Sequence, residues 1–334
     1  MGTPAIAADD LHKSYGEVVA LDGVSFAVPF GSVTGLLGRN GSGKTTTVAI
    51  LATSVRADAG GARVAGFDVA RQPEAVRRSI GFAGQFAAVD ANLTGTENLV
   101  LIGRLSRLGR RQARRRAVEL AERFGITDAA GRLVRTYSGG MRRRLDLAAA
   151  LVASPPVVFL DEPTTGLDPE SRHGLWETIT ELVASGTTVL LTTQYLEEAD
   201  ALCDQVVIIE RGRVVATGTP AELKASVGTV VIELTFPTDT DAQVAADRLV
   251  GCGWHPERSG SVVSVRSERG SQAVVAVARD LDGVSPDPRA VSVREATLDD
   301  AFLALTATQG ATASGSDGAG PGPAGAPAVT ESAR

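Results

Sequence analysis

The sequence predicts an α/β fold: a phosphate-binding core on a parallel sheet carries a helical insertion and is followed by a small C-terminal α+β domain. Three observations lead to this fold class. A glycine-rich loop, GRNGSGKTTT, joins an apolar strand pattern to a helix pattern. Two later runs, PVVFLDEP and TTVLLTT, are short, continuous and rich in Val and Leu, as is typical of strands buried in a parallel sheet. After residue 228, shorter strand and helix patterns alternate.

The first unit is expected to span residues 5–225 and to begin with strands joined by turns. The apolar run VTGLLG is the strand before the glycine-rich loop, and a helix starts at Lys44. A helix from about Glu170 to Ser185 separates the two buried strands. The stretch DQVVIIERGRVVATG then predicts a hairpin that turns at Arg211 and Gly212.

A helical subdomain is expected at about residues 90–151, where helix formers dominate and RRQARRRAVELAERFGI is amphipathic. The basic run between Arg104 and Arg116 has no interleaved aromatic residues, so a solvated helix face is favoured over a nucleic-acid contact. Contact with an anionic membrane surface is a third interpretation of this run, and it stays open.

A second unit is expected at residues 229–308, as a small α+β accessory domain. Thr297 and Asp300 have the spacing of a capping box at the start of its last helix. The remaining residues, 309–334, are mostly Gly, Ala, Pro and Ser, and this composition predicts a disordered tail.

The composition excludes several classes of protein. The chain has 334 residues, with 33 basic and 39 acidic side chains, and its net charge of −6 supplies no overall attraction to nucleic acid. Cys203 and Cys252 are far apart in the sequence and stand in no metal-type spacing, which argues against a disulfide framework or a Cys/His metal site. No leader pattern opens the chain, and its most apolar run is interrupted by Pro155 and Pro156, so no membrane span is expected.

The loop Gly38-x4-Gly43-Lys44-Thr45 has the pattern and the strand-to-helix context of a nucleotide phosphate loop. Its glycines allow consecutive N–H groups to surround phosphates, Lys44 reaches the β- and γ-phosphates, and the Thr45 hydroxyl binds Mg²⁺. The alternative is a glycine-rich turn that binds nothing.

Two carboxylates, Asp161 and Glu162, follow the strand pattern VVFL. A nucleotide site needs a carboxylate at the end of a neighbouring strand, so Asp161 is expected to hold Mg²⁺. Glu162 is expected to orient and deprotonate the attacking water, which makes the chain a hydrolase. The alternative is that the acidic pair only caps the next loop.

A second candidate anion site is Ser138-Gly139-Gly140, at the start of a helix pattern. N–H groups and the positive end of the helix dipole favour an anion there, although the same tripeptide is also a common helix cap.

Five segments in order now carry a resemblance: GRNGSGKTT, Gln85 in GFAGQFAAVDANLTGTENL, YSGGM, VVFLDEPTTGLD and LLTTQYLEEAD. Together they resemble the ATP-binding subunit of ABC transporters, with its P-loop NTPase fold, over residues 5–220. TTQYLEEAD, a single ATPase unit and the C-terminal ATLDDAFLALT make the chain similar to the ATPase subunits of daunorubicin-resistance-type drug exporters.

The resemblance implies that two subunits face each other head to tail, so that the Ser-Gly-Gly turn of one closes over the ATP bound to the phosphate loop of the other. Tyr15 is implied to stack on adenine, and Asp168 to reach the partner subunit, although a turn residue and a helix N-cap are their alternatives. The implied ATP-binding residues are Tyr15, Gly38, Asn40, Gly41, Gly43, Lys44, Thr45, Thr46, Ser138, Gly139, Gly140 and Asp168. The implied catalytic residues are Glu162, Gln194 and Gln85, and the Mg²⁺ ligands are Thr45, Gln85 and Asp161.

Gln194 departs from the wider family, in which most members have a histidine that donates to the γ-phosphate. A glutamine amide can supply the same hydrogen bond but cannot take up a proton. If Glu162 is the base, the donor role suffices, and daunorubicin-resistance-type subunits resemble this chain in having Gln at this position.

The function that the resemblance implies is a homodimeric ATPase on the cytoplasmic face of the membrane, which powers export of a hydrophobic or amphiphilic compound through a separate permease. The permease is expected to contact the region from Gln85 to Leu108. The main alternative is a soluble ABC-type ATPase that acts on ribosomes or DNA, but the chain has one ATPase unit and no sustained heptads. A nucleotide sensor without hydrolysis is the third hypothesis, which Glu162 disfavours.

Overall fold

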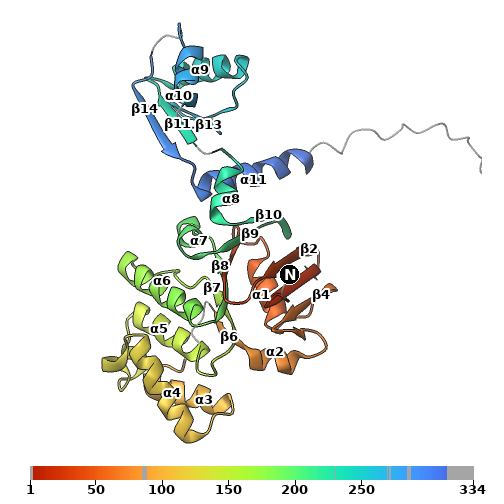
Figure 1. Cartoon of the computed structure of the whole chain (residues 1–334), viewed down its shortest axis with the longest axis vertical. Coiled ribbons are helices and arrows are strands. Elements are labelled where there is room, and N and C mark those ends of the chain that lie inside the picture. Colours follow the sequence, from red (N-terminus) through yellow and green to blue (C-terminus); the bar gives the residue numbers. More distant parts are fainter. Residues whose placement is uncertain are drawn as a thin grey trace, which may run out of the picture.

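The computed structural model describes residues 3–84, 89–228, 230–268, 270, 272–283 and 287–313, with side chains through residue 306. It contains three sheets, of which two form the first unit and the third lies in the C-terminal unit (Figure 1). Of the predicted site residues, Gln85 lies outside the described residues.

The central sheet has six strands in the order β10-β9-β3-β8-β7-β6. All neighbouring pairs in it are parallel except β9 and β10, which form the hairpin predicted around Arg211 and Gly212. Every residue of β3, β7 and β8 is buried, as their Val- and Leu-rich sequences predict. The strands are β3 (Val33–Leu37), β6 (Ile80–Ala83), β7 (Val157–Asp161), β8 (Thr188–Thr193), β9 (Gln205–Glu210) and β10 (Arg213–Gly218).

An antiparallel sheet in the order β2-β1-β4-β5 covers one side of helix α1 (Lys44–Leu51). A shared apolar cluster joins this sheet to the central one through residues such as Ile6, Val28, Ile50 and Phe159. The strands are β1 (Ile6–Tyr15), β2 (Val18–Val28), β4 (Ala59–Val64) and β5 (Phe67–Asp68).

Helices fill the stretch in which a helical subdomain is expected, and Figure 1 places them at the end of the molecule away from the C-terminal unit. Thr94 and Glu97 form a capping box at the start of the first of them. The helices are α3 (Gly95–Leu105), α4 (Arg110–Arg123) and α5 (Gly139–Ala150). The remaining helices of the first unit are α2 (Pro73–Ser79), α6 (Pro169–Ala184), α7 (Leu196–Leu202) and α8 (Pro220–Ala225).

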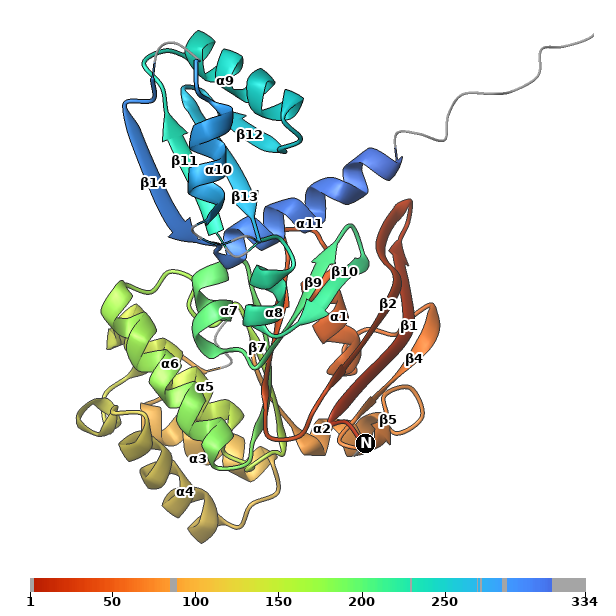
Figure 2. The same cartoon turned by 45° about the horizontal axis from the view of Figure 1, so that its top comes forward.

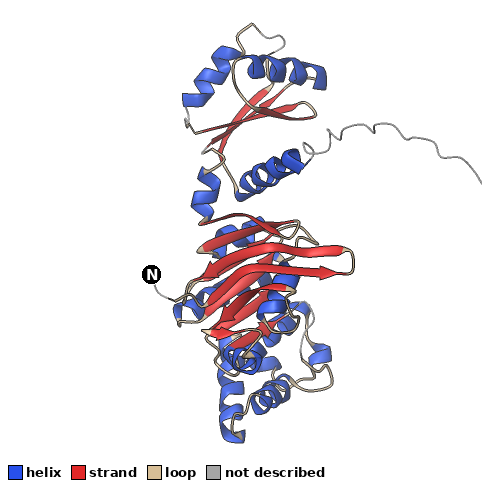
Figure 3. Ribbon diagram, turned by 90° about the vertical axis from the view of Figure 1, so that its right-hand side faces the viewer, coloured by secondary structure: helices blue, strands red, loops and turns tan. Residues whose placement is uncertain are grey.

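The C-terminal unit has the element order β11-α9-β12-β13-α10-β14, and its sheet has the strand order β12-β13-β11-β14, which is a ferredoxin-like arrangement. Figure 3 shows this sheet well separated from the two sheets of the first unit. Its apolar core is a cluster of its own, between residues 232 and 281. The elements are β11 (Val230–Thr235), α9 (Asp239–Gly251), β12 (Pro256–Ser259), β13 (Val262–Ser267), α10 (Gln272–Asp280) and β14 (Ala290–Glu295).

The last helix, α11 (Leu298–Ala313), packs differently from the rest of residues 229–308. Its buried residues Leu298, Ala301 and Phe302 belong to the apolar cluster of the first unit, where α11 contacts α7, α8 and β10 (Figure 2). The predicted capping box is confirmed, because Thr297 and Asp300 exchange hydrogen bonds. The helix extends past residue 309, where the tail was expected to begin, and residues 314–334 lie outside the described part.

Among the described residues, no helix combines the length and the apolar character that crossing a bilayer requires.

Candidate nucleotide site

The predicted site residues meet at the carboxyl edge of the central sheet. Leu37 at the end of β3 pairs with Thr193 of β8, and Thr192 pairs with Asp161 at the end of β7. The loops that follow these strands therefore begin side by side, although they are far apart in the sequence. Ligands of open α/β sheets bind in the crevice at this edge.

The phosphate loop has the glycines that its backbone requires. Gly43, the N-cap of α1, has a φ of 110°, and a Cβ there would lie 2.7 Å from the Ala20 carbonyl oxygen. A Cβ on Gly38 would lie 2.3 Å from the Ile209 carbonyl oxygen. Larger residues at either position would push the loop away from β2 or β9, so the two glycines fix where the phosphates can lie.

Lys44 is turned back into its own loop. Its ammonium donates hydrogen bonds to the carbonyl oxygens of Gly38 at 2.7 Å and Arg39 at 3.1 Å. Burial lowers the pKa of Lys44, and the charges of Glu162 and Asp161 oppose that shift. Lys44 is therefore close enough to both carboxylates to interact with them, as a lysine between a phosphate loop and a metal-binding carboxylate should be.

Thr192 joins the Asp161 carboxylate to the backbone of Glu162. Its hydroxyl donates to Asp161 Oδ1 at 2.5 Å and accepts from the Glu162 amide at 3.0 Å. Glu162 has a φ of 48°, in the left-handed region that few non-glycine residues adopt. Such a backbone persists only where its surroundings hold it, and it turns the Glu162 side chain out of the strand direction.

Gln194 follows β8 directly and is exposed. It lines a cavity of about 540 Å³ together with the first residues of the phosphate loop. The opposite wall comes from α11. The lining residues are Leu37, Gly38, Arg39, Asn40, Gln194, Leu196, Asp299, Phe302 and Leu303. Gln194 and Gly38, whose carbonyl oxygen Lys44 contacts, thus line the same cavity.

Tyr15 ends β1 and is 49% exposed, with the Lys13 ammonium 5.4 Å from its ring centre. The hairpin that it begins touches the phosphate loop at Ala20 and Leu21, which border Gly43. An exposed ring on this hairpin is available for stacking on a base, so its adenine role stays a prediction.

The Ser-Gly-Gly turn lies at the start of α5, where Ser138 accepts a hydrogen bond from the Met141 amide at 3.2 Å. Asp168 caps α6 in the same way, through the amide and hydroxyl of Ser171 at 2.9 and 2.8 Å. These hydrogen bonds lower the pKa of Asp168. Ser138 and Asp168 therefore both act as helix N-caps, which is the local alternative given above for each of them. The two helix starts are adjacent, because a Cβ on Gly140 would lie 3.0 Å from Ser171 Oγ.

Within the described part of the chain, no hydrogen bond joins the Ser-Gly-Gly turn to the phosphate loop. Ser138 and Gly139 are exposed at the surface. The structure thus brings together the phosphate loop, Asp161, Glu162 and Gln194. The turn at Ser138 is not part of this group within one chain.

The residues around the phosphate loop fit a magnesium ion that is bound mainly through nucleotide phosphates. No group of three or more His, Cys, Asp or Glu residues in the described ranges converges on a metal site. Thr45 is exposed at the start of α1, and Asp161 ends a neighbouring strand, so each can supply one oxygen. Mg²⁺ commonly binds through one or two protein oxygens, phosphates and water.

Two residues near this site make contacts that the motifs do not reveal. Thr192 bridges the Asp161 carboxylate and the Glu162 amide, and Arg143 of α5 hydrogen-bonds backbone carbonyls around Glu162. Glu198 is fully buried in α7, where burial raises its pKa. Thr192 could have been found by aligning parallel strand ends, but no local pattern distinguishes Arg143 from its neighbours Arg142 and Arg144.

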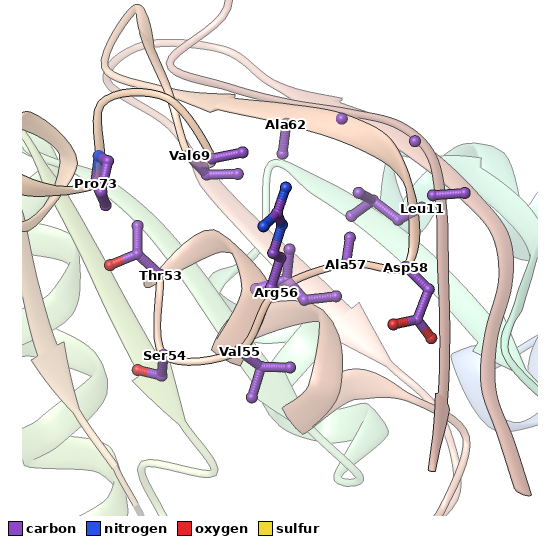
Figure 4. A pocket seen from close by; sticks show the side chains of 15 residues that line it. Leu11, Thr53, Ser54, Val55, Arg56, Ala57, Asp58, Ala62, Val69 and Pro73 are labelled. Atoms are coloured by element: carbon purple, nitrogen blue, oxygen red, sulfur yellow. The ribbon is translucent and has the colours of Figure 1, made fainter. Parts of the chain in front are cut away.

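A second cavity, of about 610 Å³, lies between the loop after α1 and strands β1 and β4 (Figure 4). In that view Arg56 extends from the loop toward Ala62. None of the predicted nucleotide residues lines this cavity, and it is not part of the site.

Comparison with known proteins agrees with this geometry. A family model described as "ABC transporter" matches residues 21–165. The daunorubicin/doxorubicin resistance ATP-binding protein DrrA of Streptomyces peucetius is 48% identical over 308 residues, which are 91% of this chain and 93% of that protein. The Nod factor export ATP-binding protein I of Ralstonia nicotianae is 39% identical over 91% of this chain and 94% of its own.

A solved structure described as the ATP binding subunit of an ABC transporter is 30% identical, with a TM-score of 0.61. It covers 67% of this chain, and 93% of its own length is matched. The predicted P-loop NTPase fold of ABC ATPases is thereby confirmed. The chain belongs to the family of ABC transporter ATP-binding proteins, as an ATPase similar to the daunorubicin/doxorubicin-resistance type.

Proposed function

We propose that two copies of this chain enclose ATP between them and that hydrolysis drives export of a hydrophobic or amphiphilic compound through a separate membrane permease. The observation that carries the dimer is the exposed Ser138-Gly139-Gly140 turn at the N-terminus of α5. A helix start of this kind suits a phosphate, yet it makes no hydrogen bond to the phosphate loop of its own chain in the described residues. The phosphate loop of a second copy would bring the phosphates of its bound ATP to this turn.

In this proposal the phosphate loop holds the β- and γ-phosphates, and Lys44 exchanges the carbonyls of Gly38 and Arg39 for phosphate oxygens. Glu162 orients the attacking water and accepts its proton. Gln194 donates a hydrogen bond to the γ-phosphate. Gln85, which comes shortly after β6 in the sequence, contributes to catalysis.

The metal in this proposal is Mg²⁺, which neutralises charge on the phosphates when bound. Thr45, Asp161 and Gln85 would hold it. The remaining residues proposed to bind ATP are Tyr15, Gly38, Asn40, Gly41, Gly43 and Thr46, with Ser138, Gly139, Gly140 and Asp168 acting toward the partner's nucleotide.

A groove of about 630 Å³ between α2 and the end of α3 supports the proposal of a separate permease. Leu105 on its edge is 74% exposed, and Arg77, Arg78 and Arg107 supply positive charge. An exposed apolar side chain beside a groove with charged edges fits a short amphipathic segment from another protein. We place the cytoplasmic loops of the permease here, which would hold the ATPase on the cytoplasmic face of the membrane.

The compound is assigned by class. Relatives of this chain are named for resistance to daunorubicin and doxorubicin, and others for Nod factor export. Among these, identity is higher to the resistance proteins, so an antibiotic or a related drug is the proposed cargo.

The dimer is tested with Glu162→Gln, which should bind ATP but hydrolyse it far more slowly. We expect this variant to be monomeric without nucleotide and dimeric with ATP, as measured by light scattering after gel filtration. Adding Ser138→Arg should prevent the dimer, since a long cation replaces the small cap at the helix start. A matched control, Ser259→Arg on the exposed strand β12, should leave it intact. A monomer under all conditions would contradict the enclosed-ATP arrangement.

A further inference from the structure

Arg143, near the start of α5, forms hydrogen bonds with two segments that are distant in the sequence, residue 84 and residues 161–163. Its guanidinium donates to the carbonyl oxygens of Gly84 at 2.5 Å, Pro163 at 2.8 Å and Asp161 at 3.3 Å. Its side chain is only 12% exposed. Burial lowers the pKa of Arg143, but the nearby Asp146 carboxylate, 3.4 Å away, favours its charged form.

The three carbonyls have a particular relation to the proposed catalytic residues. Asp161 and Pro163 are the residues on either side of Glu162, so Arg143 holds the backbone carbonyl of the residue before the proposed base and of the residue after it. Gly84 directly precedes Gln85. One side chain of the helical subdomain therefore holds the backbone on both sides of Glu162 and at Gly84, the residue before Gln85.

The Glu162 backbone needs such support. Its φ of 48° lies in the left-handed region, which costs a non-glycine residue of order 1–3 kcal/mol unless the surroundings over-determine it. Thr192 holds the Glu162 amide from the β8 side, and Arg143 holds the flanking carbonyls from the α5 side. A lysine could not replace this arrangement, because only the planar guanidinium presents donors in several fixed directions.

We propose that Arg143 is a positioning residue that couples the orientation of α5 to the geometry of Glu162 and of the backbone before Gln85. Arg143 lies on the same helix that begins at the Ser-Gly-Gly turn, so a change in α5 when that turn meets nucleotide is transmitted to the base. Arg143 does not touch the substrate. The inference rests on the proposed role of Glu162.

The test compares Arg143→Gln and Arg143→Lys with Arg142→Gln, a matched control because Arg142 is the exposed neighbour on the same helix. We expect Arg143→Gln to lower kcat by about 10²-fold, the scale of a misplaced catalytic group, with ATP affinity changed less than about threefold. Arg143→Lys should restore only part of the rate. Thermal unfolding of each variant checks that it is folded. If Arg143→Gln is not folded, the comparison with Arg142→Gln is made with Arg143→Lys.

A double-substitution cycle distinguishes this role from a general loss of structure. If Arg143 acts through Glu162, then Glu162→Gln should lower kcat far less in the Arg143→Gln background than in the unaltered chain. Additive losses, a parallel loss of ATP affinity, or an Arg143→Gln rate equal to that of Arg142→Gln would overturn the inference. Unaltered turnover in Glu162→Gln alone would instead overturn the assignment of the base, which separates the two failures.

Discussion

Thr192 forms hydrogen bonds with both acidic residues of the site. Its hydroxyl donates to the Asp161 carboxylate and accepts from the Glu162 amide, so it aligns the proposed metal ligand with the proposed base. Asp161 is buried, and leaving a buried carboxylate without one of its hydrogen-bond donors is energetically costly. The geometry of the site is thus sensitive to a residue that carries no charge.

Replacing Thr192 with Val keeps the shape and removes the hydroxyl. We expect kcat to fall about tenfold, corresponding to roughly 1.4 kcal/mol, while ATP affinity changes little. Steady-state ATPase assays and a fluorescent nucleotide titration would measure the two quantities. Thr34→Val is the control, because Thr34 is buried in β3 and its hydroxyl has no hydrogen-bond partner among the described residues. An equal effect of both substitutions would show that the hydroxyl of Thr192 is not what matters.

At the scale of elements, α11 ties the C-terminal unit to the ATPase core. It follows β14 in sequence, yet its apolar face lies in the cluster that also contains Leu223 of α8. Asp299, Phe302 and Leu303 of the same helix line the cavity beside Gln194 and the phosphate loop. The C-terminal unit is thereby connected by a packed helix to the edge of the nucleotide site.

Phe302→Ala tests that packing. Phe302 is 8% exposed, and removing a buried aromatic ring of this kind costs about 3–5 kcal/mol when the cavity does not close. We expect a clear decrease in the urea midpoint of the chain. Leu303→Ala, at a neighbouring position that is 51% exposed, should change the midpoint little. Similar midpoints for the two variants would mean that α11 is not firmly packed against the core.

At the scale of the whole molecule, Figure 1 shows helices α2 and α3, which border the groove, in the part of the molecule away from the C-terminal unit. A permease bound at the groove would therefore leave the C-terminal unit pointing away from the membrane. The ferredoxin-like sheet has its own core and would stay free for other contacts.

Leu105→Arg tests this placement. In gently solubilised membranes of the host, the unaltered chain should purify together with a polytopic membrane protein, identified by mass spectrometry. Leu105→Arg should lose that protein, because it puts a long cation where an exposed apolar contact is proposed. Val118→Arg, on the exposed face of α4, should keep it. Loss in both variants, or in neither, would move the docking site away from the groove.

The local chemistry of the site could be predicted from the sequence. A few neighbouring residues determine each of three features: the phosphate loop, the two carboxylates at the end of β7, and the helix start at Ser138. Glycine conformations, strand hydrophobicity and helix caps act over short stretches, which is why the β9/β10 hairpin and the Thr297 capping box agree with expectation. The presence of Gln194 where most of the family has a histidine can also be recognised from the sequence, because it concerns one position of a recognisable segment.

The relation between distant segments was decided by the tertiary structure. No local pattern shows that Thr192 reaches the Asp161 carboxylate and the Glu162 amide, that Arg143 holds the residues around Glu162, or that α11 returns to the ATPase core. Such contacts depend on which strand ends become neighbours and which helix faces meet, and these are set by packing of the whole chain. The sequence determined which chemical groups the protein has for binding and hydrolysing ATP, and the fold decided which residues hold those groups in place.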